Sequence, residues 1–137
     1  MQKIRRRLCR DDGERDEGAL AVASGLSAGY RPVPSVSLQL GHTPGHSVYS
    51  VESKGQRLVL WGDLMHVAAV QFPKPTVTIS FDVDSPAASA QRRKAYADAA
   101  KGRYLVAASH LPFPGIGRLR AEGKGYVWVP LTYNSVR

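Results

Sequence analysis

Histidines and one aspartate are grouped around an apolar segment near the middle of the chain. His42 and His46 flank a Pro-Gly pair. Asp63 and His66 follow the apolar run Leu58–Trp61. Imidazoles and a carboxylate at strand ends can converge on one point, and nitrogen and oxygen ligands of this kind suit zinc or a similar divalent ion. A single histidine is more often structural than metal-binding, so the prediction of a metal site depends on the group as a whole.

The segments around these residues resemble the second half of the metallo-β-lactamase superfamily. His42-Thr-Pro-Gly-His46 and then Trp61-Gly-Asp63 match two of its motifs, and Ala108–Gly117, which contains His110, is similar to its last histidine motif. The resemblance covers residues 33–130, in the order of the family. Three further segments are similar to the branch that includes relatives of methyl parathion hydrolase: Val67–Pro75, Ile79–Asp84 and Gly125–Pro130.

The resemblance implies a two-zinc site and its ligands. In the superfamily, the first histidine of Gly-His-Thr-Pro-Gly-His binds metal, the aspartate of Gly-Asp bridges two ions, and the last histidine binds the second ion. The matching residues are His42, Asp63 and His110. Asp63 is also the candidate catalytic residue, since a water held between two ions becomes a hydroxide nucleophile near neutral pH. His46 is expected to shape the turn or support His42, and His66 to line the pocket or orient its loop.

The first half of the family pattern has no counterpart here. Its ligand motif, His-x-His-x-Asp-His, precedes everything that matches, and no histidine occurs before His42. The expected fold class is therefore α/β (α+β): a partial αββα metallo-β-lactamase sandwich, second half only, over residues 33–137. Residues 1–32 mix basic and acidic side chains and are expected to form a poorly ordered arm. One histidine per ion is short of the three protein ligands usual for catalytic zinc, so the chain alone is expected to hydrolyse little.

Alternation, turn residues and helix caps predict the elements that position these side chains. Pro44-Gly45 suits a type II turn. Ser85 as N-cap, Pro86 at the first helical position and Gly102 in a left-handed conformation bound a helix over residues 86–101. Strands are expected at 36–40, half buried; at 48–51 and 57–61, as a hairpin; at 76–80, as an edge strand; at 104–108, buried; and at 118–122 with 126–129, as a closing hairpin.

Length and composition limit the class of protein. The chain has 137 residues, of which 43% are hydrophobic and 22% charged, which fits one globular domain at most. No apolar run approaches the ~20 residues of a membrane span, and no secretory signal is visible. We therefore expect a cytoplasmic protein that does not bind membranes. Cys9 is the single cysteine, which excludes an internal disulfide and a thiolate metal cluster.

The net charge of +8 raises the question of an acidic partner. Several of the basic residues fall in or beside the predicted helix. A solvated helix face is favoured over a phosphate-binding stripe, and nucleic acid is not expected as a partner. The residues concerned are Arg92, Arg93, Lys94, Lys101 and Arg103.

Three functions agree with these patterns. The favoured one is a zinc-dependent hydrolase that acts on a small ester, lactone or related substrate through a metal-bound hydroxide. The alternative is a non-catalytic remnant or binding module whose basic surface takes an acidic partner, and a nucleic-acid processing enzyme is the third. Self-association through exposed sheet edges is also expected, because half a sandwich leaves edges and apolar faces uncovered.

Overall fold

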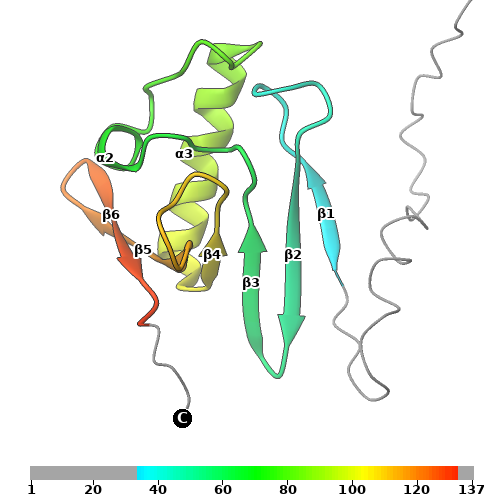
Figure 1. Cartoon of the computed structure of the whole chain (residues 1–137), viewed down its shortest axis with the longest axis vertical. Coiled ribbons are helices and arrows are strands. Elements are labelled where there is room, and N and C mark those ends of the chain that lie inside the picture. Colours follow the sequence, from blue (N-terminus) through cyan, green and yellow to red (C-terminus); the bar gives the residue numbers. More distant parts are fainter. Residues whose placement is uncertain (1–33, 133–137) are drawn as a thin grey trace, which may run out of the picture. The chain divides into compact units, whose positions relative to one another are not determined.

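Six strands form one mixed sheet in residues 34–132, which are the residues that the structure, a computed structural model, describes (Figure 1). The strands follow one another in the sheet in sequence order. β3 and β4 pair in parallel, and the other neighbouring pairs are antiparallel. The arm expected over residues 1–32 lies outside the described residues. The strands are β1 (Ser35–Leu38), β2 (Ser47–Ser53), β3 (Gln56–Leu60), β4 (Leu105–Ala107), β5 (Ile116–Glu122) and β6 (Gly125–Pro130).

Both hairpins predicted from the sequence are confirmed. β2 and β3 pair as far as Ser53 with Gln56, so a two-residue turn, Lys54-Gly55, joins them. Both turn residues have positive φ, 49° and 73°, as a type I′ turn requires. β5 and β6 likewise pair as far as Glu122 with Gly125.

The turn before β2 differs from its predicted type. His46 N–H donates to the carbonyl of Thr43, which closes a turn around Pro44-Gly45. Gly45 is not among the described residues with positive φ, and a type II turn requires positive φ at that position. The type II prediction is therefore wrong, although the turn itself is present.

The predicted edge strand at residues 76–80 is also wrong. This segment is irregular because side chains occupy its backbone groups. The Val77 carbonyl accepts hydrogen bonds from Gln71 and Arg92, and Ile79 N–H donates to Asp82. These bonds attach the segment to the body of the domain without a strand partner.

Helix α2 (Ala68–Gln71) and helix α3 (Ser85–Gly102) follow β3. The long helix is confirmed, but its ends differ from those predicted. Asp84 rather than Ser85 is the N-cap, and its side chain accepts a hydrogen bond from Ala87 N–H. Gly102 is the last helical residue, and Arg103 takes the left-handed conformation with φ of 53°. Within residues 34–132, neither helix has the length and apolar character needed to cross a bilayer.

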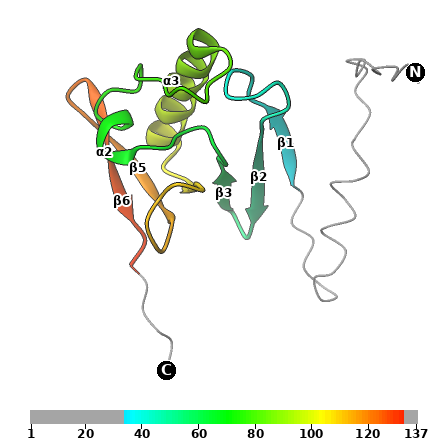
Figure 2. The same cartoon turned by 45° about the horizontal axis from the view of Figure 1, so that its top comes forward.

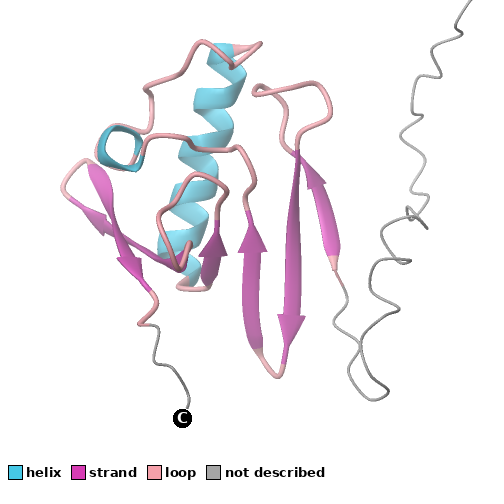
Figure 3. Cartoon of the chain, viewed as in Figure 1, coloured by secondary structure: helices cyan, strands magenta, loops and turns pink. Residues whose placement is uncertain are grey.

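The core lies between α3 and one face of the sheet (Figures 2 and 3). Val59 and Val106 from the sheet and Tyr96 and Ala99 from the helix are at most 4% exposed. Trp61 stacks on Tyr96 with ring centroids 5.2 Å apart. Successive strand residues point to opposite faces, so buried residues alternate with less buried ones in β2 and β5. The half-sandwich prediction is confirmed: one sheet carries one helical layer.

Arg92 corrects the prediction of a solvated basic helix face. Its neighbours Arg93 and Lys94 are exposed, but Arg92 is only 1% exposed. It lies four residues from both Ala88 and Tyr96, which are buried on the same side of α3. Spacing therefore places this charge inside the molecule.

Within residues 34–132, the opposite face of the sheet carries exposed apolar side chains over β1, β2 and β3. Val36, Tyr49 and Leu60 are paired across β1, β2 and β3 and are 44%, 43% and 38% exposed. The prediction of a half-buried first strand is wrong, because β1 is the edge strand and all four of its residues are exposed. An uncovered apolar sheet face of this kind favours association.

We expect the chain to self-associate through this face and its β1 edge. Leu38→Lys places a charge on a residue that is 64% exposed in β1, and it should weaken association about tenfold or more, because burying a leucine contributes roughly 1.5–3 kcal/mol. Sedimentation velocity over a concentration series measures this. Val70→Lys is the matched control, since Val70 is also exposed (44%) but lies on α2. A monomer at all concentrations would contradict the prediction.

Candidate metal centre

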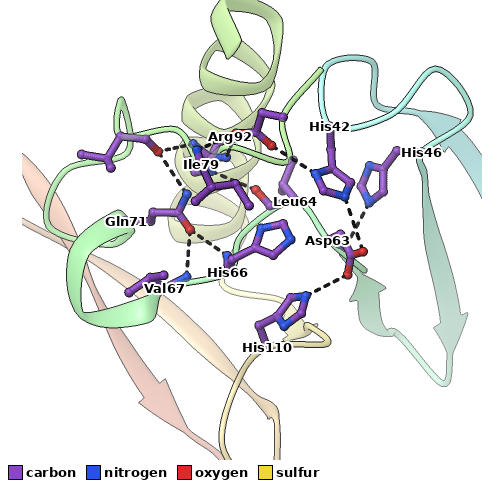
Figure 4. Close-up of polar contacts among 12 residues, drawn as sticks. His42, His46, Asp63, Leu64, His66, Val67, Gln71, Ile79, Arg92 and His110 are labelled. Atoms are coloured by element: carbon purple, nitrogen blue, oxygen red, sulfur yellow. Dashed lines mark hydrogen bonds and ion pairs between the residues drawn. The ribbon is translucent and has the colours of Figure 1, made fainter. Parts of the chain in front are cut away.

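Three loops lie close together at one end of the sheet. β1 and β3 both run antiparallel to β2, and β3 runs parallel to β4. The carboxyl ends of β1, β3 and β4 therefore lie at the same end of the sheet (Figure 1). The loops at residues 39–46, 61–67 and 108–115 therefore lie close together. They contain all four histidines of the chain and Asp63. Figure 4 shows these side chains facing one another.

Asp63 lies between two of the histidines. Its Oδ2 is 3.6 Å from Nε2 of His42, and its Oδ1 is 3.2 Å from Nε2 of His110. The side chains of Asp63 and His110 are each 42% exposed, and that of His42 is 12% exposed. The structure thus brings together the three residues that the resemblance implies as ligands, with one carboxylate oxygen toward each imidazole.

The His42 ring is oriented by a buried carboxylate. Its Nδ1 lies 3.1 Å from Oδ1 of Asp82, whose side chain is fully buried. With the Nδ1 proton donated to Asp82, the lone pair of Nε2 faces Asp63. A carboxylate in this position commonly sets the tautomer and direction of a metal-binding histidine.

Asp82 is kept ionised by its neighbours. Burial alone would raise the pKa of Asp82, but the hydrogen bond with His42, the hydrogen bond from Ile79 N–H and the charge of Arg92 outweigh it. The net effect is a pKa below the ordinary value of an aspartate. Asp82 therefore carries its negative charge toward His42 across the neutral pH range.

Arg92 joins three segments beneath this carboxylate. Its Nη2 lies 3.3 Å from Oδ2 of Asp82. Its Nε donates to the Leu64 carbonyl at 2.9 Å, and its Nη1 donates to the carbonyls of Pro75 and Val77. One buried guanidinium therefore connects the loop after β3, the segment after α2 and the partner of His42.

His46 contacts the backbone of the centre. Its Nε2 accepts a hydrogen bond of 3.1 Å from Asp63 N–H, and its ring meets that of His42 edge-on with centroids 5.7 Å apart. Gly62 has a φ of 54° at this point, and an added Cβ would lie 3.2 Å from the His46 ring. His46 thus holds the Gly62-Asp63 turn. This contact adds to the role predicted for His46, which was to shape the Pro44-Gly45 turn or support His42.

His66 lies between the other two rings. Its centroid is 4.9 Å from that of His42 and 4.3 Å from that of His110. Burial, followed by the neighbouring rings of His110 and His42, lowers the pKa of His66. The neutral imidazole, which is the metal-binding form, is therefore favoured.

Sequence reasoning missed three buried polar residues that position this centre: Gln71, Asp82 and Arg92. Gln71 is fully buried, and its Oε1 accepts hydrogen bonds from His66 N–H (2.7 Å) and Val67 N–H (3.0 Å). The signal for Asp82 was its place inside the matching segment Ile79–Asp84. No local pattern distinguishes Gln71 or Arg92 from solvated side chains.

Close backbone approach also holds the first loop in place. Gly41 has a φ of 128°, and an added Cβ would collide with the backbone of Ala88 in the first turn of α3. Val83 N–H and Asp84 N–H donate to the carbonyls of His42 and Gly41. The segment that carries His42 is thereby attached to the start of the long helix.

The donor set fits a divalent ion such as zinc. It consists of imidazole nitrogens and one partly exposed carboxylate, without a thiolate, and these are common zinc ligands. Single ligand atoms of His42, Asp63 and His66 all lie within 4.8 Å of one another. His66 Nδ1 is buried and has no hydrogen-bond partner within residues 34–132, which leaves a donor for an ion.

No protein-family model and no curated protein matches the chain. Solved structures do match it. The chain is 32% identical to AidC, described as a dizinc quorum-quenching lactonase in complex with the product N-hexnoyl-L-homoserine, with a TM-score of 0.71 over 74% of this chain and 35% of that one. It is 42% identical to AbOPH, a hydrolase in the beta lactamase superfamily, with the same TM-score and coverage.

A third match shows likeness of fold alone. A probable metal-dependent hydrolase from Staphylococcus aureus is 16% identical, with a TM-score of 0.60 over 77% of this chain and 39% of that one. The chain therefore spans little more than a third of the length of these three structures.

Proposed function

Since the chain belongs to the metallo-β-lactamase superfamily, we propose that it is the second half of the catalytic domain of a zinc-dependent hydrolase. One observation carries this proposal: the two oxygens of Asp63 face the imidazoles of His42 and His110, at 3.6 Å and 3.2 Å. That is the arrangement suited to a carboxylate placed between two cations. The proposed substrate is a small ester or lactone, and the likeness to a lactonase supports it.

The residues of this chain would hold the ions and keep their ligands oriented. His42, Asp63 and His110 would bind, and Asp82 would hold the His42 ring with Nε2 toward the centre. When bound, such ions act as Lewis acids that polarise a carbonyl oxygen and lower the pKa of a coordinated water. His46 would hold the Asp63 backbone through its hydrogen bond to that residue's N–H. The remaining ligands would come from the half that the chain does not contain.

The test supplies that missing half. A family N-terminal half carrying His-x-His-x-Asp-His, fused ahead of residue 33, should complete the two-zinc ligand set and restore turnover of an activated ester or lactone. Turnover should be lost with His42→Ala, Asp63→Ala or His110→Ala, whereas the chain alone should show little turnover. A folded, zinc-loaded fusion that hydrolyses neither substrate would contradict the proposal.

Binding of an acidic partner is the second candidate function. Arg57, Lys101, Arg103 and Arg118 come from separate elements and line one hollow of about 660 Å³ together with Asp98. This gathering supports a basic binding surface more strongly than the sequence did. An acidic ligand that binds the metal-free chain, with an affinity that falls steeply with salt and with Arg118→Ala, would favour this function. Salt-independent or undetectable binding would argue against it.

A further inference from the structure

His66 is the histidine of the centre whose ring has no hydrogen bond within the described residues. Its Nδ1 is buried and unpartnered, and its polar contact there is made by the backbone N–H. The rings of His42 and His46 each make one hydrogen bond, with Asp82 and with Asp63 N–H respectively, although His46 Nδ1 is also buried and unpartnered. A buried polar atom without a partner costs roughly 1–3 kcal/mol. A bound ion would offset that cost.

The backbone of His66 is nevertheless held firmly. Gln71 accepts hydrogen bonds from both His66 N–H and Val67 N–H, and its Nε2 donates to the Val77 carbonyl at 3.0 Å. Arg92 donates to the same carbonyl at 2.6 Å. The His66 ring itself stacks on that of His110 with centroids 4.3 Å apart, so packing orients the ring on a fixed backbone, as a preorganised ligand requires.

The His66 ring lies near the ligand atoms of His42 and Asp63. One ligand atom each from His42, Asp63 and His66 lie within 4.8 Å of one another. His42 and His66 supply nitrogen, and Asp63 supplies oxygen and the negative charge. Two imidazoles and a carboxylate make up a common three-residue set for catalytic zinc.

We propose that His66 is the third protein ligand of a single divalent ion held by His42, Asp63 and His66 in this chain. The three residues come from two loops of this chain, so the site does not depend on ligands from the missing half. His110, whose side chain is 42% exposed and contacts the other oxygen of Asp63, lies outside this set. The inference deepens the proposed function, because it names a ligand for the same centre and rests on that centre binding metal.

Cobalt titration of the metal-free full chain tests the proposal, with visible absorption as the readout. We expect one Co²⁺ per chain. His66→Ala should weaken binding by roughly 10–100-fold or more, since even groups that only support a ligand have effects of that size. The matched variant His110→Ala should retain one-to-one binding with a smaller loss. Circular dichroism confirms that each variant is folded.

A cysteine at position 66 separates a ligand from a residue that merely lines the site. His66→Cys should bind Co²⁺ and gain an intense sulfur-to-cobalt charge-transfer band, because a thiolate would enter the coordination sphere. The unmodified chain, which contains Cys9, gives the baseline, and His46→Cys should add no band. Two results together would show that His66 is not a ligand: His66→Ala binds Co²⁺ as tightly as the unmodified chain, and His66→Cys shows no band. Metal binding by the chain would still stand. An unmodified chain that binds no Co²⁺ would overturn both this site and metal binding by the chain alone, but would leave the fused hydrolase open to its own test.

Discussion

Replacing Arg92 with methionine is expected to lower the free energy of unfolding by about 3–5 kcal/mol, the usual cost of removing one partner of a buried ion pair. The change would leave Asp82 buried without its guanidinium partner and would remove the hydrogen bonds that Arg92 donates to the carbonyls of Leu64 and Val77. Methionine keeps most of the side-chain volume, so lost packing contributes little. Urea denaturation followed by circular dichroism measures the effect.

Arg93→Met is the matched control for this prediction. It removes the same charge from the next residue of α3, which is exposed, and should change the stability by no more than about 0.5 kcal/mol. Equal effects of the two substitutions would mean that the buried pair with Asp82 does not stabilise the fold.

Asp63→Asn is expected to weaken zinc binding about 100-fold or more. The amide keeps the shape of the side chain but loses the negative charge that faces His42 and His110. Neutral donors alone hold a divalent cation less firmly than a set that includes a carboxylate. Calorimetric titration with zinc measures the change.

Two further variants serve as controls for the Asp63→Asn prediction. Asp98→Asn makes the same substitution on the exposed side of α3 and should leave zinc binding unchanged. His46→Ala should reduce the affinity less than Asp63→Asn does, because His46 contacts the backbone of Asp63 rather than its carboxylate. A larger loss with His46→Ala would show that the ligand set is wrong.

The elements governed by short-range rules were predictable from the sequence. The hairpin through Lys54-Gly55 and the long helix both depend on residues within a few positions of one another. Boundaries were less predictable, because Asp84 and Ser85 are both good N-caps and the structure uses Asp84. Proline at the second turn position is favourable in both type I and type II turns, so the Pro-Gly pair alone did not decide the turn type at Gly45.

The support of the candidate centre depends on long-range contacts, which local patterns do not encode. Arg92 stands in a basic run that is typical of a solvated helix face, yet its partners Asp82 and Leu64 lie 10 and 28 residues away in the sequence. Gln71 likewise has no local signature, although it sets the loop of His66. Resemblance to a family named His42, Asp63 and His110, but the position of the His66 ring became visible with the fold.

Anomalous X-ray diffraction from crystals of the chain grown with zinc tests the central claim most directly, because it locates the ion. We expect a peak at the zinc edge about 2.0–2.2 Å from Nε2 of His42 and from a carboxylate oxygen of Asp63. Zinc bound elsewhere on the protein, with no peak beside these two residues, would contradict the account.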